Sequence, residues 1–166
     1  KRLHRLIMTS QAYRQTSRRL AKLDELDPDN RLLGRMSVRR LEAETLRDSI
    51  LFVSGQWNPR MFGKPVSVKE DEVGQIVVGV STNDSSNRPT GKTISLGAEE
   101  NRRSLYVEVR RSKVLSFVDA FDAPSMEPNC TKRTISTVAP QALMLMNNSF
   151  VINESRSMAG RVQHFA

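Results

Sequence analysis

At 166 residues the chain is long enough to form one domain that buries about two thirds of its unfolded surface. Hydrophobic residues make up 38% and charged residues 27%, which is typical of a globular protein and excludes an intrinsically disordered one. No apolar run approaches the roughly 20 residues of a membrane-spanning helix, so no span is predicted.

The net charge of +8 raises the question of a nucleic-acid partner. The arginines are spread along the chain and often neighbour carboxylates. Aromatic residues reach only 5%, which leaves few rings for stacking on single strands. Nucleic acid is therefore the least favoured of the anionic partners that a basic surface could meet.

Two helices are predicted in the first third of the chain. Residues 3–23 form an amphipathic pattern, because apolar side chains recur at three- and four-residue spacing. The turn at Asp27-Pro28 follows this helix. A second helix is predicted over 37–54, with Gly55 just past its end.

The second predicted helix carries a charged pair in its apolar stripe. On a helical wheel of 37–54, Arg39 and Glu42 fall inside that stripe, three residues apart. A charged pair there is costly unless both partners are well hydrogen-bonded. We interpret it as a structural ion pair, buried or at the edge of the stripe, with a functional site as the alternative. The opposite side carries four residues predicted to form solvated pairs: Arg40, Glu44, Arg47 and Asp48.

Residues 65–110 contain the predicted β structure. The runs 65–69 and 75–80 flank a turn and are predicted to pair as a hairpin. Alternating apolar and polar residues predict a third strand over 105–110. The polar stretch before it is predicted to be an exposed excursion, with a short strand near 93–96.

The last part of the chain, 115–164, is predicted to be helical, with helices over 115–121, 139–146 and 150–164. The pattern as a whole predicts a mainly helical α+β fold, in which amphipathic helices pack with a small antiparallel sheet of about three strands. The chain opens in helical phase without a cap. We therefore expect residues 1–166 to be a single-domain fragment of a longer protein.

Cys130 is the single cysteine, so the chain can form neither an internal disulfide nor a Cys-x-x-Cys-His haem attachment. Lys132 and Arg133 follow it, and nearby cations favour the thiolate, which makes Cys130 the best candidate for a reactive group. Burial without a chemical role is the simpler alternative. The two histidines lie at opposite ends of the sequence, so no metal site and no bound cofactor are predicted in this chain.

A second candidate site combines carboxylates with arginines. Asp119 and Asp122 are three residues apart and could act in acid–base hydrolysis. Arg110 and Arg111, together with Arg133, could then hold a sulfated or carboxylated glycan. The favoured alternative is structural: Asp122 caps the turn that follows it, and Asp119 neutralises an arginine.

Four segments of the chain, taken together, resemble a known family. They are Leu3-His-Arg-Leu-Ile-Met-Thr-Ser-Gln-Ala-Tyr-Arg, Asp27-Pro-Asp-Asn-Arg-Leu-Leu-Gly-Arg-Met, Arg39-Arg-Leu-Glu-Ala-Glu-Thr-Leu-Arg-Asp and the stretch 102–151. This ordered set is similar to the planctomycete cytochrome-c-associated domain of unknown function, the C-terminal one of a pair. The positions that match its motifs are Arg39, Glu42, Arg110, Arg111, Asp122, Pro124, Cys130, Arg133 and Gln141.

The resemblance implies a setting rather than a reaction. In that family the domain lies in long exported proteins, many of which carry a haem-binding cytochrome c domain. We therefore expect a periplasmic or secreted location, neighbouring domains of the same polypeptide as partners, and haem in one of those neighbours. The resemblance also leads us to expect that an upstream helical portion of the family domain precedes this sequence in the longer protein. The family has no established activity, so the resemblance transfers no catalytic residue.

Overall fold

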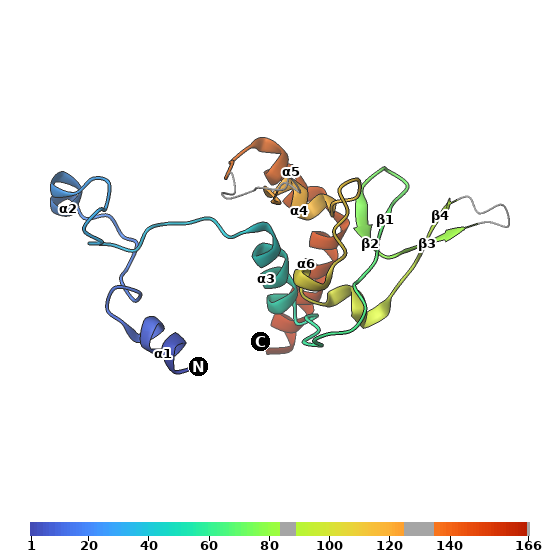
Figure 1. Cartoon of the computed structure of the whole chain (residues 1–166), viewed down its shortest axis with the longest axis horizontal. Coiled ribbons are helices and arrows are strands. Elements are labelled where there is room, and N and C mark those ends of the chain that lie inside the picture. The colour runs from blue at the N-terminus through green and yellow to red at the C-terminus, as the bar shows by residue number, and fades with distance from the viewer. Residues whose placement is uncertain (84–88, 125–134, 166) are drawn as a thin grey trace. The chain divides into compact units, whose positions relative to one another are not determined.

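The computed structural model describes residues 1–83, 89–124 and 135–165. The chain falls into two compact units, Lys1–Arg40 and Leu41–Ala166, which we call the N-terminal and the C-terminal unit. Figure 1 shows the N-terminal unit in blue and the helices and hairpins of the C-terminal unit in the colours that follow. The single-domain organisation expected from the sequence stays a prediction.

The N-terminal unit contains two short helices, α1 (Arg2–Thr9) and α2 (Ala21–Leu26). The prediction of one helix over 3–23 is therefore wrong. Hydroxyl groups explain the break, because Thr9 Oγ1 donates to the carbonyl of Arg5 at 2.7 Å and Ser10 Oγ donates to that of Ile7 at 2.7 Å. Such side chains compete with the backbone donors that would continue the helix. No residue of this unit is buried.

The described residues of the C-terminal unit form four α-helices: α3 (Ala43–Ser54), α4 (Ser116–Ala120), α5 (Ala139–Asn147) and α6 (Ser149–Phe165). The last three confirm the helices predicted between 115 and 164. Helix α3 packs against both α4 and α6, and Figure 1 shows α3 and α6 side by side. Among the helices that the structure describes, none is both long and apolar enough to cross a membrane.

The strands within the described part of the chain form two antiparallel pairs. Strands β1 (Val68–Glu70) and β2 (Ile76–Val78) confirm the predicted hairpin, while β3 (Val80–Asn83) pairs with β4 (Pro89–Ile94). Two 3₁₀ helices follow, η1 (Gly97–Asn101) and η2 (Ser104–Tyr106). The described residues thus form a mainly helical α+β fold with small antiparallel sheets, as the sequence predicted.

The third strand predicted over 105–110 does not form. The backbone N–H groups of Tyr106 and Val107 donate to the carbonyls of Arg103 and Ser104, at 2.9 and 3.1 Å. These local bonds make η2 and use amides that a strand would offer to its neighbour. Val107 keeps one parallel bridge with Val66.

The core of the C-terminal unit gathers where α3, α4 and the bridge at Val107 meet. Phe117 lies at its centre, with ring centroids 5.0 Å from Phe121 and 5.5 Å from Phe150. Seven buried apolar side chains form the cluster: Ala43, Val66, Val107, Leu115, Phe117, Val118 and Phe121. This small core positions the first turns of α3 beside the segment 103–109.

The charged pair predicted inside the second helix lies outside it. Because α3 begins at Ala43, Arg39 and Glu42 precede the helix, and both are exposed. Their placement in a buried helical stripe is therefore wrong. The stripe that α3 does bury contains Ala43, Arg47, Leu51 and Ser54.

Candidate functional site

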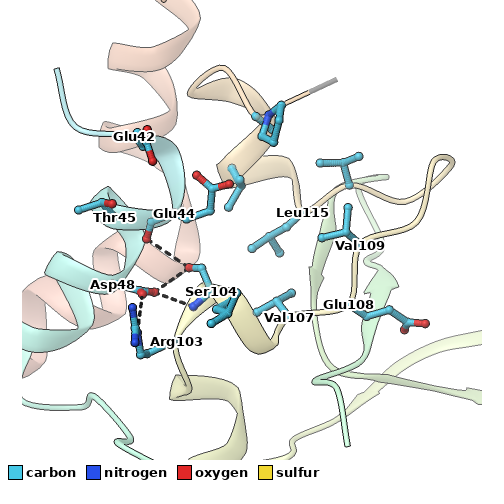
Figure 2. Close-up of a pocket in the computed structure, with 15 residues that line it drawn as sticks. Glu42, Glu44, Thr45, Asp48, Arg103, Ser104, Val107, Glu108, Val109 and Leu115 are labelled. Atoms are coloured by element: carbon cyan, nitrogen blue, oxygen red, sulfur yellow. Dashed lines mark hydrogen bonds and ion pairs between the residues drawn. The ribbon is translucent and has the colours of Figure 1, made fainter. Parts of the chain in front are cut away.

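A pocket of about 460 Å³ opens in the C-terminal unit between the first turns of α3, the segment 103–109 and α4. Its floor is apolar, since Val107, Leu115 and Val118 are buried core residues. Carboxylates stand around it, and Figure 2 shows those of α3 facing Val107, Val109 and Leu115 across the hollow. The acidic lining residues are Glu42, Glu44, Asp48 and Glu108.

The Ser104 hydroxyl group in this pocket is bound to structural partners. Ser104 Oγ lies 2.7 Å from Asp48 Oδ1, and the same oxygen accepts the Ser104 backbone N–H at 2.7 Å. Asp48 Oδ2 also lies 3.6 Å from Arg103 Nε. These contacts, drawn in Figure 2, tie the segment 103–109 to α3. The described lining residues include no histidine and no cysteine, so the pocket offers Ser104 no base other than a carboxylate that is already hydrogen-bonded.

Arg47 belongs to the buried stripe of α3 and is only 3% exposed. Its Nη2 donates to the carbonyl of Glu100 at 2.7 Å and its Nη1 to that of Arg102 at 2.9 Å. Burial lowers the pKa of Arg47, and the charges of Asp48 and Glu154 oppose that shift. The prediction of a solvated Arg47 is wrong: the guanidinium ties α3 to η1 and to the start of η2.

Arg102 is another buried cation, only 1% exposed. Its guanidinium donates to the backbone carbonyls of Lys64, at 3.0 Å, and of Phe62. It also lies 4.3 Å from the ring centroid of Tyr106, in the geometry of a cation–π contact. Glu99 Oε2 lies 3.3 Å away and supplies opposite charge. Arg102 therefore fixes the loop 62–64 onto the core.

Asp122, one of the predicted catalytic carboxylates, makes structural contacts. Its oxygens accept the Ser136 backbone N–H at 2.8 Å and the Ser136 hydroxyl at 2.7 Å. The Gln141 side-chain amide lies 3.5 Å from the same carboxylate. Asp122 thus joins the end of α4 to the start of α5. Asp119 lies on α4 with an exposed side chain.

Two of the three predicted anion-binding arginines, Arg110 and Arg111, are surface residues. Arg110 pairs with Glu108, with its Nη2 and Nε each 2.7 Å from Glu108 Oε1. Arg111 is exposed. Cys130 and Arg133 lie outside the described residues, so their places in the predicted sites stay predictions. Within the described part of the chain, no group of three or more His, Cys, Asp or Glu side chains is arranged to hold a metal ion.

Sequence reasoning missed the buried arginines because their partners are distant in the sequence. Arg47 bonds to carbonyls more than fifty residues away, and these contacts follow no local period. One signal was present, since Ala43, Arg47 and Leu51 recur at four-residue spacing on one face of a helix. The stronger apolar pattern of the neighbouring face concealed it.

Comparison with protein-family models identifies the family of this chain. A family model described as PSD1, protein of unknown function (DUF1553), matches residues 1–165. The chain belongs to the PSD1 family. The match spans both units, and it confirms the sequence-based assignment to a domain of unknown function. No curated protein and no solved structure matches the chain.

Proposed function

We propose that this PSD1 protein is a non-catalytic interaction module of an exported, multi-domain planctomycete protein. In this proposal it docks beside a haem-binding cytochrome c domain of the same polypeptide, in the periplasm or outside the cell. The chain itself holds no cofactor, and haem belongs to the neighbour. The four sequence motifs that resemble the cytochrome-associated domain support this setting.

One observation carries the non-catalytic part of the proposal. Two charged side chains that are buried in the C-terminal unit, those of Arg47 and Arg102, bind the protein's own backbone. Arg47 and Arg102 donate to carbonyls of four other residues, and the Ser104 hydroxyl bonds to Asp48. Donors that are occupied in this way stabilise the fold, which supports a structural role for these side chains.

The alternative of an enzyme acting on anionic glycans receives less support from the described residues. It requires Asp119 or Asp122 to face Arg110 and Arg111 across an open pocket. Instead Asp122 is bound by Ser136, and Arg110 pairs with Glu108 on the surface. None of the two aspartates and two arginines lines the 460 Å³ pocket.

The proposal is tested by titrating the whole chain with the haem-bearing part of its own polypeptide in a calorimeter. We expect binding at 50 mM NaCl that weakens about tenfold or more at 500 mM, because contacts between charged surfaces are screened by salt. Absence of binding at low ionic strength would contradict the proposal. So would hydrolysis of a sulfated or carboxylated glycan by the purified chain, if the Asp122→Asn variant had lost it.

A further inference from the structure

The positive charge of the chain is concentrated in the N-terminal unit. Residues 1–40 contain eleven lysines and arginines against four aspartates and glutamates, a net charge of +7. Residues 41–166 contain fifteen against fourteen, a net charge of +1. The C-terminal unit is thus nearly neutral, and the anion-attracting surface of the protein is its first forty residues.

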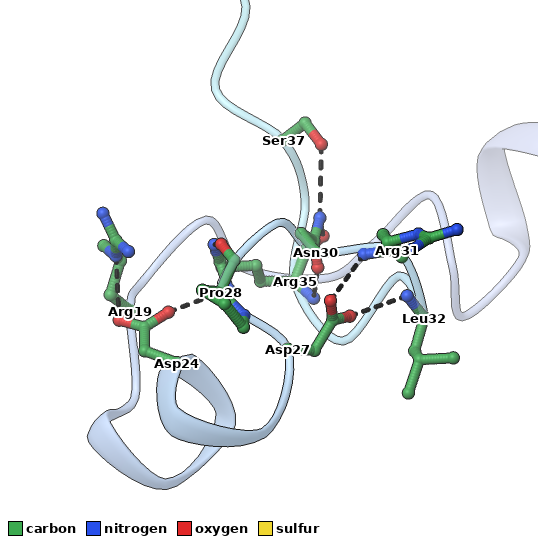
Figure 3. Close-up of polar contacts among 9 residues, drawn as sticks. All are labelled: Arg19, Asp24, Asp27, Pro28, Asn30, Arg31, Leu32, Arg35 and Ser37. Atoms are coloured by element: carbon green, nitrogen blue, oxygen red, sulfur yellow. Dashed lines mark hydrogen bonds and ion pairs between the residues drawn. The ribbon is translucent and has the colours of Figure 1, made fainter.

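Half of the carboxylates of this unit are used in internal contacts, which Figure 3 shows. Asp24 lies 2.8 Å from Arg19 Nε and 2.9 Å from Arg35 Nη1. Asp27 accepts the backbone N–H groups of Arg31 and Leu32, at 2.8 and 2.7 Å. These contacts stabilise the loop 27–35 and leave few anions to neutralise the remaining cations.

The remaining cations point to solvent. Eight exposed arginines and lysines of the unit have no ion pair to a carboxylate within the described residues: Lys1, Arg2, Arg5, Arg14, Arg18, Lys22, Arg31 and Arg39. A surface with this excess of one sign attracts a polyanion over a distance set by the ionic strength.

Apolar side chains accompany these cations. Leu3, Leu6 and Ile7 share one face of α1 and are 64%, 68% and 46% exposed, while Arg5 lies on the other side. The loop 27–35 presents two more leucines, Leu32 and Leu33, at 83% and 61%. Leu33 has a φ of +57°, a conformation that leucine rarely adopts, so the loop holds this side chain outward against its backbone preference.

We propose that the N-terminal unit binds the surface of an anionic phospholipid bilayer. Helix α1 lies in the interface with Leu3, Leu6 and Ile7 among the acyl chains, and its arginines meet the headgroup phosphates. The unit rests on the bilayer and does not span it. This proposal rests on the interaction role given above, and it adds a partner that is independent of the haem domain.

The apolar face decides between a bilayer and a hydrophilic polyanion. Nucleic acids and acidic polysaccharides offer phosphates, sulfates or carboxylates but no apolar layer for three aliphatic side chains. Nucleic acid also favours aromatic rings for stacking, and Tyr13 is the single aromatic residue of the unit. A basic helix with an opposed aliphatic face is typical of proteins that lie at a lipid surface.

The test is co-sedimentation of the full chain with sonicated vesicles of phosphatidylglycerol and phosphatidylcholine, one to three, beside vesicles of phosphatidylcholine alone. We expect binding to the anionic vesicles at 50 mM NaCl and release at 500 mM. The triple substitution Leu3→Asn, Leu6→Asn and Ile7→Asn should weaken that binding at least about tenfold. Arg2→Gln combined with Arg5→Gln should weaken it by about twentyfold or more.

Two matched variants control for general effects. Met8→Gln removes an exposed apolar residue from the other side of α1, and Arg111→Gln removes an exposed cation from the C-terminal unit. Both should bind like the unaltered chain. Because α1 buries none of its residues, the variants should keep the circular dichroism melting curve of the parent chain.

Three results would overturn the proposal: no binding to anionic vesicles, equal binding to neutral ones, or unchanged binding by the triple asparagine variant. In the last case, competition by double-stranded DNA would identify a hydrophilic polyanion site instead. A loss of vesicle binding with retained binding to the haem domain would remove this proposal alone. Retained vesicle binding without binding to the haem domain would contradict only the function proposed above.

Discussion

At the scale of single residues, the structure depends on arginines that bind backbone. Arg47 and Arg102 satisfy carbonyls of segments that lack regular hydrogen-bonding partners, in place of a larger apolar core. A guanidinium suits this role because it offers five donors in a fixed plane. The same side chains would be costly if their partners were absent, since a buried charge without compensation destabilises a fold strongly.

Replacing Arg47 with alanine should lower the free energy of unfolding by about 3–5 kcal/mol, because the carbonyls of Glu100 and Arg102 would remain buried without a donor. Arg47→Lys should recover only part of this loss, since an ammonium group does not reproduce the planar fork. Urea denaturation followed by circular dichroism measures the change. Arg111→Ala, at an exposed position, is the control and should stay within about 0.5 kcal/mol of the parent. An equal effect of Arg47→Ala and Arg111→Ala would contradict the structural role.

At the scale of elements, the end of α3 shows how a helix terminates beside another helix. Gly55 follows the last turn with a φ of +81°, the left-handed conformation that glycine accommodates. Arg161 of α6 crosses at this point and donates through Nη1 to the carbonyl of Val53. Gly55 therefore ends α3 in the left-handed conformation. Because it has no side chain, it also leaves room for Arg161 of α6.

Gly55→Ala should destabilise the protein by about 1–2 kcal/mol, because a Cβ at this φ is strained and would lie 2.7 Å from Arg161 Cδ. Gly160 is the matched control. It lies inside α6 with open space around it, and Gly160→Ala should stabilise by about 0.5–1 kcal/mol through helix propensity. Thermal unfolding of both variants measures the opposite signs. A stabilising Gly55→Ala would show that the αL cap is not needed.

The loop 27–35 should be sensitive to acid. The backbone N–H groups of Leu32 and Arg31 hold the pKa of Asp27 below its ordinary value. A depressed pKa in the folded state means that the carboxylate stabilises the loop above the ordinary pKa of about 3.9, and that this contribution is lost as the pH falls through the lower, folded value.

The amide signals of Arg31 and Leu32 report this transition in an NMR titration from pH 6 to pH 2. We expect both to shift upfield below pH 4 with a common midpoint, since their acceptor loses its charge. The Asp27→Asn variant should show no such transition. Amide positions that stay constant to pH 2 would contradict the role of Asp27.

The elements that could be predicted from the sequence are those that depend on residues close to one another in the chain. The helix over 139–146 follows from Pro140 in its first turn, and the hairpin at 65–80 follows from two β-branched runs around a turn. The helix predicted over 3–23 failed because Thr9 and Ser10 bond to carbonyls of the preceding turn. The alternation of apolar and polar residues over 105–110 predicted a strand. The backbone hydrogen bonds of η2 use the N–H groups that such a strand would need.

The candidate site was predictable only in part. The structural role of Asp122 was among the expected alternatives, although its partner Ser136 was not identified. The pocket beside α3 was not predicted at all, because it is lined by segments that are up to about eighty residues apart in sequence. No single-sequence period connects Asp48 to Ser104, and that contact fixes the wall of the pocket.

At the scale of the whole molecule, the two units differ in their buried residues, their net charge and their exposed apolar side chains. The C-terminal unit has the apolar core and the buried arginines, and its net charge is +1. The N-terminal unit has no buried residue, a net charge of +7 and exposed leucines on α1 and on the loop 27–35. This difference in charge and exposed apolar surface is what the proposed binding role of the N-terminal unit requires.

Hydrogen–deuterium exchange of the full chain, with and without vesicles that contain phosphatidylglycerol, tests most directly whether this protein acts by binding through its N-terminal unit. At 50 mM NaCl the vesicles should slow exchange in peptides from residues 1–40, most strongly in α1, and leave the peptides of α3 and α6 unchanged. Slowed exchange confined to the pocket segment 103–118, with none in residues 1–40, would contradict the account.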